Sequence, residues 1–291
     1  MTVNIDITKE LKAVEKLIKS DINKEKTILG LYNYIFKSDG KKIRSRLNLI
    51  ASSSRKNSHR YKLASIIELL HTATLVHDDV VDNASTRRGA VSVNSLWSNA
   101  HGVLIGDYIY SKAFMLMVEI GKKDILAELA DATNDISQGE LIQLDAISNI
   151  KISLNKLKKI SYFKTGRLFE ASAKTGAMLA GANKNFIKNI GESAKNIGIL
   201  FQIKDDLLDY SNTSKTGKQS FQDLKEGKVT YPFFFALKNS SQKEKKQLIS
   251  FLGNQRLNEK KALVLISKLN GLTKTQQLAE KFYTSSIDAA K

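Results

Sequence analysis

Apolar residues recur along most of the chain at the three- and four-residue spacing of helices that bury one face. Runs typical of strands, bounded by turn residues, are hard to find. Pro232 is the single proline, so little in the sequence would interrupt long helices. We therefore expect an all-α fold. The helices are expected over residues 5–37 (in one or two segments), 43–53, 61–82, 93–100, 103–120, 123–148, 154–181, 184–210, 231–238, 242–252, 257–268 and 272–289.

Polar stretches interrupt this helical pattern. A turn is expected at residues 38–40 and a loop over residues 83–91. The stretch between Tyr210 and Thr230 contains glycine and has no helical period, and a loop of that length inside a compact domain is usually functional or mobile. Because no shift in composition marks a boundary, we expect a single domain over residues 1–291.

The composition narrows the classes of protein that remain. Hydrophobic residues make up 42% of the chain, enough to fill a sizeable core, and the absence of cysteine excludes disulfides and thiolate metal sites. Residues 1–20 lack the apolar core of a signal peptide. No uncharged apolar run approaches the roughly 18 residues that a membrane span needs. We expect a cytoplasmic protein without a transmembrane segment.

The net charge of +17 points to an anionic partner, which is a nucleic acid, a membrane surface or a polyanionic small substrate. Basic residues nowhere alternate with aromatic residues as they do in a nucleic-acid platform. Lysine-rich stretches such as Lys156–Lys159 and Lys243–Lys246 fit solvated helix faces. Charge alone would allow a nucleic-acid or membrane-binding module, but we expect no nucleic-acid partner.

Two aspartate motifs of the form Asp-Asp-x-x-Asp lie inside apolar helices. In a helix, residues i and i+4 share a face, so Asp78 and Asp82 project together, as do Asp205 and Asp209. Adjacent buried carboxylates repel and require a cation. Mg²⁺ prefers oxygen ligands and is typically held by one or two carboxylates plus substrate phosphates. The motifs therefore predict a magnesium–diphosphate site. They consist of Asp78-Asp79-Val80-Val81-Asp82 and Asp205-Asp206-Leu207-Leu208-Asp209.

Other interpretations of the aspartates are weaker. A solvated acidic helix end or a salt-bridged pair would explain either motif alone, but two motifs, each after an apolar run, favour the metal site. A carboxylate-bridged di-iron bundle would require Glu-x-x-His pairs on facing helices, and the sequence has none.

A diphosphate site also needs cationic side chains, and arginine suits phosphate by its fork geometry. Basic residues are placed around both motifs, although each alone is a weak signal. Lys41 and Arg44 lie at a turn that enters a helix, where backbone N–H groups also favour anions. The others are Arg87 and Arg88 after the first motif, Lys164 in a helix, and Lys218 and Lys228 after the second motif.

With these features the chain resembles the trans-polyprenyl diphosphate synthase family, above all its bacterial long-chain, octaprenyl-type members. The match runs from about Gly40 to Leu237. It rests on ELLHTATLVHDDVVDNASTRRG (68–89), Gly106-Asp107, YFKT (162–165), FQIKDDLLDY (201–210) and DLKEGKVTYP (223–232). The resemblance implies a single all-α isoprenoid-synthase bundle of about ten or more helices around a deep central cavity, usually a homodimer.

The resemblance also implies roles for single residues. Asp78, Asp79 and Asp82 would bind two Mg²⁺ ions on the allylic diphosphate, and Asp205, with Asp206 and Asp209 nearby, would bind a third. Arg87, Lys164, Lys218 and Lys228 would hold the allylic diphosphate. Lys41, Arg44, His71 and Arg88 would hold the diphosphate of isopentenyl diphosphate. Lys164, Thr165 and Gln202 would be the catalytic residues, with Thr165 and Gln202 lining the reacting carbons. Tyr162 is interpreted as a core residue.

Product length is expected to depend on Ala73 and Thr74, before the first motif. At least one of them is often aromatic in short-chain enzymes of the family, and both are small here. The resemblance therefore suggests that farnesyl or geranyl diphosphate is extended to a long all-trans product. It also allows a transient contact of the enzyme with a membrane when the product is released. Helical geometry places Thr74, but not Ala73, on the face of Asp78.

The chain departs from the family's pattern at four positions. Asp39 and Phe221 stand where the family usually has glycine, and Ser45 and Val91 stand where it usually has proline. The chain also ends at Lys291, where the family normally adds another helix pair and a basic tail. The C-terminal helices are therefore expected to be short or missing.

Three alternatives stay open at this point. The first is a short-chain farnesyl or geranylgeranyl diphosphate synthase. The second is a terpene cyclase, which the basic residues expected at the isopentenyl site argue against. The third is a non-catalytic partner subunit of a heteromeric synthase, although such subunits usually lose one aspartate motif and this chain keeps both.

Overall fold

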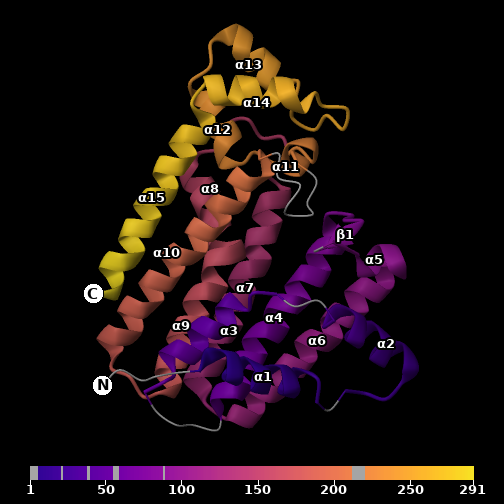
Figure 1. The fold of residues 1–291 in the computed structure, drawn as a ribbon, viewed down its shortest axis with the longest axis vertical. Helices are drawn as coiled ribbons and strands as arrows, with labels where there is room; N and C mark the ends of the chain where they lie inside the picture. Colours follow the sequence, from indigo (N-terminus) through magenta and orange to yellow (C-terminus); the bar gives the residue numbers. More distant parts are fainter. Residues whose placement is uncertain (1–5, 21, 38–39, 55–58, 88, 212–219) are drawn as a thin grey trace. The chain divides into compact units, whose positions relative to one another are not determined.

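The computed structural model describes residues 6–20, 22–37, 40–54, 59–87, 89–211 and 220–291, and over these ranges the fold is all-α apart from one small hairpin (Figure 1). The sequence-based prediction of the fold class is confirmed. Contacts divide the chain into two compact units. The first unit is Met1–Asp131 with Ala171–Gly191, and the second is Ala132–Glu170 with Glu192–Lys291. The single domain remains a prediction.

The first unit is built around α4, a long helix with an almost wholly buried face. Leu63, Ile66 and Leu70 are fully buried on it. The helix packs along α6, and α1 and α3 pack against it. These elements are α1 (Ile7–Ile18), α2 (Lys26–Ile35), α3 (Ile43–Ala51), α4 (His59–Val81), α5 (Val93–Leu96) and α6 (Asn99–Ile120).

Two glycines on α6 bring this helix close to the end of α4 that carries the first aspartate motif. A Cβ atom added at Gly106 would lie 2.2 Å from His77 Nε2, and one added at Gly102 would lie 2.6 Å from Val80 Cγ2. Larger residues at these positions would displace the His77 or Val80 side chain or the helices themselves.

The loop predicted over residues 83–91 contains a small hairpin. Strands β1 (Thr86–Arg87) and β2 (Ala90–Val91) pair antiparallel, with Arg87 opposite Ala90. Asn83 and Gly89 take φ values of 49° and 77°, in the left-handed region that turns require. The hairpin matters for the site because it fixes the backbone of Arg87.

The second unit has its core around α10 and α12. Ile203, Tyr231 and Phe233 are buried together there. Pro232 lies in the first turn of α12, where its missing N–H costs no helical hydrogen bond. The described elements are α8 (Leu154–Ser161), the π-helix η1 (Tyr162–Gly166), α11 (Gln222–Lys225), α12 (Tyr231–Lys238), α13 (Gln242–Ile249), α14 (Glu259–Lys268) and α15 (Gly271–Ala290).

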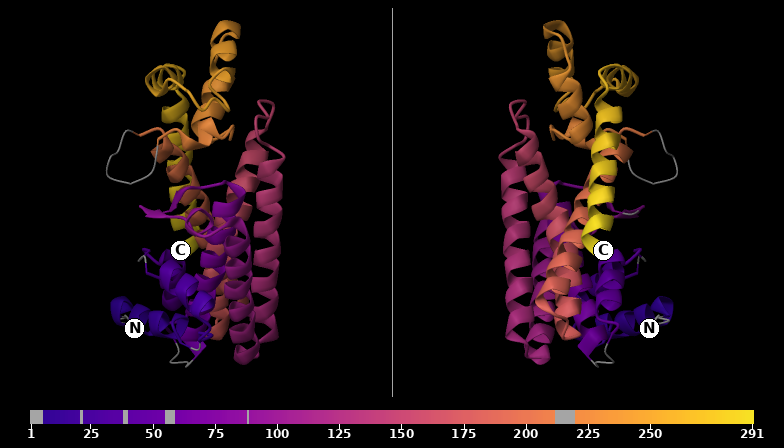
Figure 2. Two further views of the ribbon diagram at one scale, coloured as in Figure 1. Left: turned by 90° about the vertical axis from the view of Figure 1, so that its right-hand side faces the viewer. Right: turned by 90° about the vertical axis from the view of Figure 1, so that its left-hand side faces the viewer.

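Three further helices, α7 (Lys123–Leu144), α9 (Arg167–Leu179) and α10 (Lys184–Asp209), contribute residues to both units. Within the second unit α15 runs beside α10 (Figure 2), and Ser193 Oγ donates to the Ser286 backbone oxygen at 2.7 Å. No helix in the described part of the chain combines the length and the apolar character needed to cross a bilayer.

Two sequence-based expectations need correction. A single helix was expected over residues 154–181, but a π-helix divides it into α8 and α9. No helix was expected between Tyr210 and Thr230, but α11 lies there. Residues 212–219 of that stretch lie outside the described residues.

Candidate active site

The residues predicted for the site fall into two groups, one in each unit, and each group is described by itself. Arg88 and Lys218 lie outside the described residues, as does Asp39. The first half-site consists of Lys41, Arg44, His71, Asp78, Asp79, Asp82 and Arg87, with Ala73 and Thr74. The second half-site consists of Lys164, Thr165, Gln202, Asp205, Asp206, Asp209 and Lys228.

In the first half-site, Asp79 already has a cationic partner. It is only 4% exposed, and Arg87 Nε donates to its Oδ1 at 2.7 Å while a second guanidinium nitrogen completes an ion pair. Burial raises the pKa of Asp79, and Arg87 opposes that rise. Asp78 and Asp82, one helical turn apart, are half-buried. Asp79 thus holds Arg87, and the outer two aspartates share the face nearer solvent.

Arg44 and His71, both predicted from the family resemblance to hold isopentenyl diphosphate, are in direct contact. An Arg44 terminal nitrogen lies 3.1 Å from His71 Nε2. Because a guanidinium only donates, His71 Nε2 is the acceptor in this pair. Lys41 is exposed at the turn before α3, and its carbonyl oxygen accepts from Arg46 Nε at 2.9 Å. The structure therefore brings Arg44 of α3 and His71 of α4 together.

Ser45, at the position where the family usually has proline, fastens α3 to α4. Its buried hydroxyl lies 3.0 Å from the Ala64 carbonyl oxygen and 2.8 Å from Glu68 Oε2. Arg44 is the preceding residue on α3. These contacts of the hydroxyl hold the start of α3 against α4.

A pocket of about 390 Å³ lies in the first unit, and Thr72, Leu75, Val76 and Asp79 line it from α4. The two predicted chain-length residues have different surroundings. Ala73 is fully buried, whereas Thr74 is half-buried and donates from its hydroxyl to the His71 carbonyl oxygen at 2.8 Å.

The second half-site is centred on the π-helix η1. Its hydrogen bonds run from i to i+5, and such segments often occur at functional sites because they change side-chain directions locally. Lys164 and Thr165 lie in this segment. Lys164 Nζ forms an ion pair with Glu140 Oε2 at 2.7 Å and a hydrogen bond with Gln143. Neither partner was predicted from the sequence. The one indication was that Glu140 and Gln143 lie one turn apart on α7 and so share a helix face.

Thr165 begins a chain of hydrogen bonds that reaches the second aspartate motif. Its hydroxyl donates to Gln202 Oε1 at 2.8 Å, and Gln202 Nε2 donates to Asp206 Oδ1 at 2.9 Å. The Tyr231 backbone N–H donates to Asp206 Oδ2 at 3.2 Å. Asp206 is 5% exposed, and burial raises its pKa well above the ordinary value. With both oxygens occupied, Asp206 orients Gln202, and Gln202 orients Thr165.

Two glycines allow this arrangement. A Cβ atom added at Gly198 on α10 would lie 2.5 Å from the Gly166 Cα atom in η1. Gln202 follows Gly198 by one helical turn on the same face. The close approach of α10 to the end of η1 therefore brings Gln202 within reach of Thr165.

Asp209, the last residue of α10, has one carboxylate oxygen with a backbone donor and one buried oxygen without a partner among the described residues. Its Oδ1 accepts from the Gln222 backbone N–H at 2.9 Å, but among the described residues no donor reaches Oδ2. Burial, reinforced by the charge of Asp223, raises the pKa of Asp209 to about 7. A buried carboxylate oxygen without a donor, close to further aspartates, is a position where a bound cation would be strongly stabilised by the surrounding negative charge.

The oxygen donors of both motifs fit Mg²⁺ better than a softer metal. Over the described ranges, no three Asp, Glu, His or Cys side chains come close enough to enclose a metal ion by themselves. Mg²⁺ usually completes its coordination with substrate phosphate oxygens and water. The donor set therefore suits a metal that binds together with a phosphate-bearing substrate.

Phe221, at the position where the family usually has glycine, adopts a backbone conformation that favours glycine. Its φ is 60°, in the left-handed region that costs a bulky residue about 1–2 kcal/mol. The side chain is only 2% exposed and meets the Tyr210 ring edge-on at 5.2 Å between centroids. Burial of the ring offsets the strain. Nearby, Lys228 Nζ pairs with Glu226 Oε2 at 2.8 Å.

Comparisons with known proteins agree with this picture. A profile of the polyprenyl synthetase family matches residues 25–269. The decaprenyl-diphosphate synthase of Dictyostelium discoideum is 37% identical over 298 residues, and the match covers 99% of this chain and 64% of that protein. The octaprenyl diphosphate synthase of Escherichia coli is 33% identical over 294 residues, covering 99% of this chain and 91% of that protein.

A solved structure shares the fold. The polyprenyl synthase from Caulobacter crescentus, crystallised with calcium and isoprenyl diphosphate, superimposes with a TM-score of 0.90 at 32% identity, covering 98% of this chain and 88% of that one. The chain belongs to the polyprenyl synthetase family. The resemblance recognised in the sequence is thereby confirmed.

Proposed function

We propose that the protein is a Mg²⁺-dependent prenyltransferase that condenses an allylic diphosphate, farnesyl or geranyl diphosphate, head-to-tail with isopentenyl diphosphate. The named relatives are octaprenyl and decaprenyl diphosphate synthases, which supports a long-chain, all-trans product. The small side chains of Ala73 and Thr74 support the same product class. The observation that carries the proposal is the buried Oδ2 of Asp209, which has no hydrogen-bond partner among the described residues, because such an atom favours a cation at the second motif.

Asp78, Asp82, Asp205 and Asp209 are the proposed metal ligands, for three Mg²⁺ ions per active site. Bound Mg²⁺ stabilises the negative charge that develops on the leaving diphosphate. The binding of calcium and isoprenyl diphosphate by the Caulobacter protein is consistent with this assignment. Asp79, whose Oδ1 accepts from Arg87, and Asp206, whose two oxygens accept from Gln202 and from the Tyr231 backbone, contribute by holding Arg87 and Gln202 in place.

The basic residues divide between two diphosphates. Arg87, Lys164, Lys228 and Lys218 bind the allylic diphosphate, and Arg44 with His71, Lys41 and Arg88 binds that of isopentenyl diphosphate. When the allylic diphosphate binds, Lys164 gives up part of its contact with Glu140 and contacts phosphate oxygens instead. Fixed cations of this kind stabilise the transition state because they need little reorganisation when the leaving group takes up charge.

The chemistry follows from these roles. The allylic C–O bond breaks and its electron pair leaves with the diphosphate, so a delocalised carbocation remains. The double bond of isopentenyl diphosphate supplies the electrons of the new C–C bond, and a proton is then lost to the departing diphosphate. Because Thr165 donates its hydroxyl proton to Gln202, its oxygen presents lone pairs to other partners, which suits an atom beside a cation.

A homodimer is the proposed assembly, and α6 offers the surface for it. Leu104, Met115 and Val118 are 66%, 67% and 70% exposed. At about 100° per residue they lie along one side of the helix. Large apolar side chains exposed in a row commonly mark a protein interface.

Product analysis tests the function. The purified chain is incubated with Mg²⁺, farnesyl diphosphate and isopentenyl diphosphate, and the products are identified by mass. We expect a ladder that ends in a long-chain polyprenyl diphosphate. Products that stop at geranylgeranyl diphosphate would favour the short-chain alternative. Inactivity that a partner subunit relieves would favour the heteromeric alternative.

A further inference from the structure

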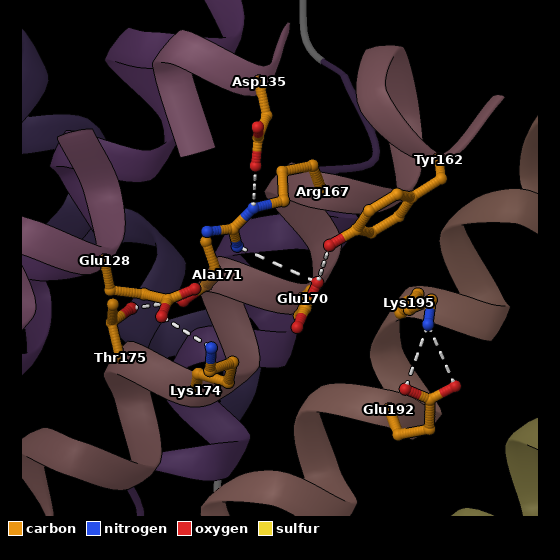
Figure 3. Close-up of polar contacts among 10 residues, drawn as sticks. All are labelled: Glu128, Asp135, Tyr162, Arg167, Glu170, Ala171, Lys174, Thr175, Glu192 and Lys195. Carbon is orange, nitrogen blue, oxygen red and sulfur yellow. Dashed lines mark hydrogen bonds and ion pairs between the residues drawn. The ribbon is translucent and has the colours of Figure 1, made fainter. Parts of the chain in front are cut away.

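The π-helix η1 brings Tyr162 and Glu170 together. Each residue of an α-helix turns by about 100°, so residues i and i+7 lie on one face, whereas residues i and i+8 are about 80° apart. Tyr162 and Glu170 are an i,i+8 pair. Nevertheless the Tyr162 hydroxyl donates to Glu170 Oε2 at 2.6 Å (Figure 3).

The π-helix explains this contact. Its wider turn accommodates one residue more than an α-turn, so residue i+8 takes the place that i+7 would have in an unbroken helix. The hydrogen bond between Tyr162 and Glu170 therefore fits the π geometry and is incompatible with a continuous α-helix over residues 162–170.

Arg167 pairs with the same Glu170 oxygen that accepts this hydrogen bond. An Arg167 terminal nitrogen lies 3.8 Å from Glu170 Oε2, and Arg167 Nε donates to Asp135 Oδ2 at 2.8 Å (Figure 3). Arg167 is 6% exposed, so this pairing is sheltered from water. Burial and the contact with Glu170 raise the pKa of Tyr162, which keeps its hydroxyl protonated as a donor.

The two residues of η1 proposed to act in catalysis depend on this geometry. In a continuous α-helix the residues after the π-turn would be rotated by about 100° relative to those before it. Thr165 reaches Gln202, and Lys164 reaches Glu140, only from their present directions. A contact that stabilises the π-turn therefore also stabilises the directions of Lys164 and Thr165.

We propose that the hydrogen bond from Tyr162 to Glu170 is a register lock, which holds η1 in its π geometry and thereby positions Lys164 and Thr165 for allylic ionisation. Tyr162 and Glu170 are positioning residues, and neither is proposed to touch the substrate. The effect on turnover rests on the proposed function, but the effect on the geometry of η1 does not.

Tyr162→Phe tests the lock because it removes the hydroxyl and keeps the ring. We expect kcat to fall by about tenfold, the effect of losing one hydrogen bond to a charged acceptor, with the KM values for both substrates changed less than about threefold. Amide hydrogen exchange at residues 164–170 should become faster. Tyr32→Phe is the matched control, since the buried Tyr32 hydroxyl donates to the Ile18 carbonyl oxygen at 2.7 Å, and it should leave kcat unchanged.

Glu170 variants provide an independent test. Glu170→Gln keeps an acceptor oxygen and should retain most of the activity, whereas Glu170→Leu should match Tyr162→Phe in kcat and in hydrogen exchange. Wild-type kcat and wild-type exchange in Tyr162→Phe, or equal losses in the two Glu170 variants, would overturn the lock. If the wild-type chain itself has no prenyltransferase activity, the proposed function fails, and the exchange data still decide whether the lock exists.

Discussion

At the scale of single residues, the middle aspartate of each motif differs from the outer two. Asp79 is paired with Arg87, and Asp206 accepts from Gln202 and from the Tyr231 backbone. Both are nearly fully buried, at 4% and 5% exposure. Helix geometry explains the difference, because residue i+1 points about 100° away from the face that residues i and i+4 share. The helical spacing of the motif already separates the middle aspartate from the outer two, and the packing adds the partners that the middle aspartate takes.

This difference predicts unequal magnesium requirements. Asp205→Asn should raise the Mg²⁺ concentration for half-maximal turnover by about tenfold or more, because a charged ligand is lost. Asp206→Asn should lower kcat through a misplaced Gln202 but change the Mg²⁺ requirement less than about threefold. Mg²⁺ titrations of both variants check this. Equal increases in the Mg²⁺ requirement would show that Asp206 is also a ligand.

Asp209 should make the metal-free protein less stable as the pH rises. Its pKa is raised from 3.8 to about 7 in the folded state, so between these values the folded protein holds more protons than the unfolded chain. The free energy of unfolding must therefore decrease with rising pH across that window and level off above it. In a chelating buffer, the melting temperature of wild type relative to Asp209→Asn should fall from pH 4 to pH 7. If the melting temperature of wild type relative to Asp209→Asn stays constant or rises from pH 4 to pH 7, the raised pKa of Asp209 is contradicted.

At the scale of elements, the apolar period predicted the long helices but neither the short helix α11 nor the π-helix η1. The expected segments 43–53, 184–210 and 231–238 agree with α3, α10 and α12 to within a few residues. The segment 154–181 was expected as one helix because a single inserted residue hardly changes an apolar pattern averaged over many turns. The π geometry of η1 accompanies a hydrogen bond from Tyr162 to Glu170, eight residues further on, and the packing of Gly166 against Gly198 on α10. The apolar period of the sequence indicates neither contact.

The close packing of η1 against α10 gives a prediction at the scale of elements. Gly198→Ala would place a Cβ atom 2.5 Å from the Gly166 Cα atom, and overpacking of this kind typically costs about 1–3 kcal/mol. Turnover should fall as well, because Gln202 would move away from Thr165. Gly30→Ala is the control, since a Cβ atom there meets nothing within 4 Å and alanine favours the α2 helix. Thermal unfolding should show a lower melting temperature for Gly198→Ala and no decrease for Gly30→Ala.

At the scale of the whole molecule, family membership was readable from the sequence, whereas the assembly depends on surface exposure. The segments around Asp78 and Asp205 carried the resemblance, and the family match over residues 25–269 confirmed it. Which apolar residues remain outside the core cannot be read from the sequence, because Met115 and the buried Met117 lie in the same apolar run of α6.

The exposed row on α6 predicts the consequence of a charge placed there. Met115→Glu should shift the protein from dimer to monomer, because an unpaired carboxylate would be buried in the interface. Sedimentation at equal protein concentration measures the change. Val264→Glu is the matched control, because Val264 on α14 is similarly exposed, at 68%. A dimer that tolerates Met115→Glu would place the interface elsewhere.

The assignment of both aspartate motifs to metal-assisted ionisation has one decisive measurement. Steady-state turnover of farnesyl diphosphate with isopentenyl diphosphate is compared at saturating Mg²⁺ for wild type, Asp78→Ala and Asp205→Ala, each shown to be folded by its melting curve. Loss of electrostatic stabilisation at the leaving group should lower kcat by about 10²-fold or more in each variant. Turnover close to wild type in a folded Asp78→Ala or Asp205→Ala protein would contradict it.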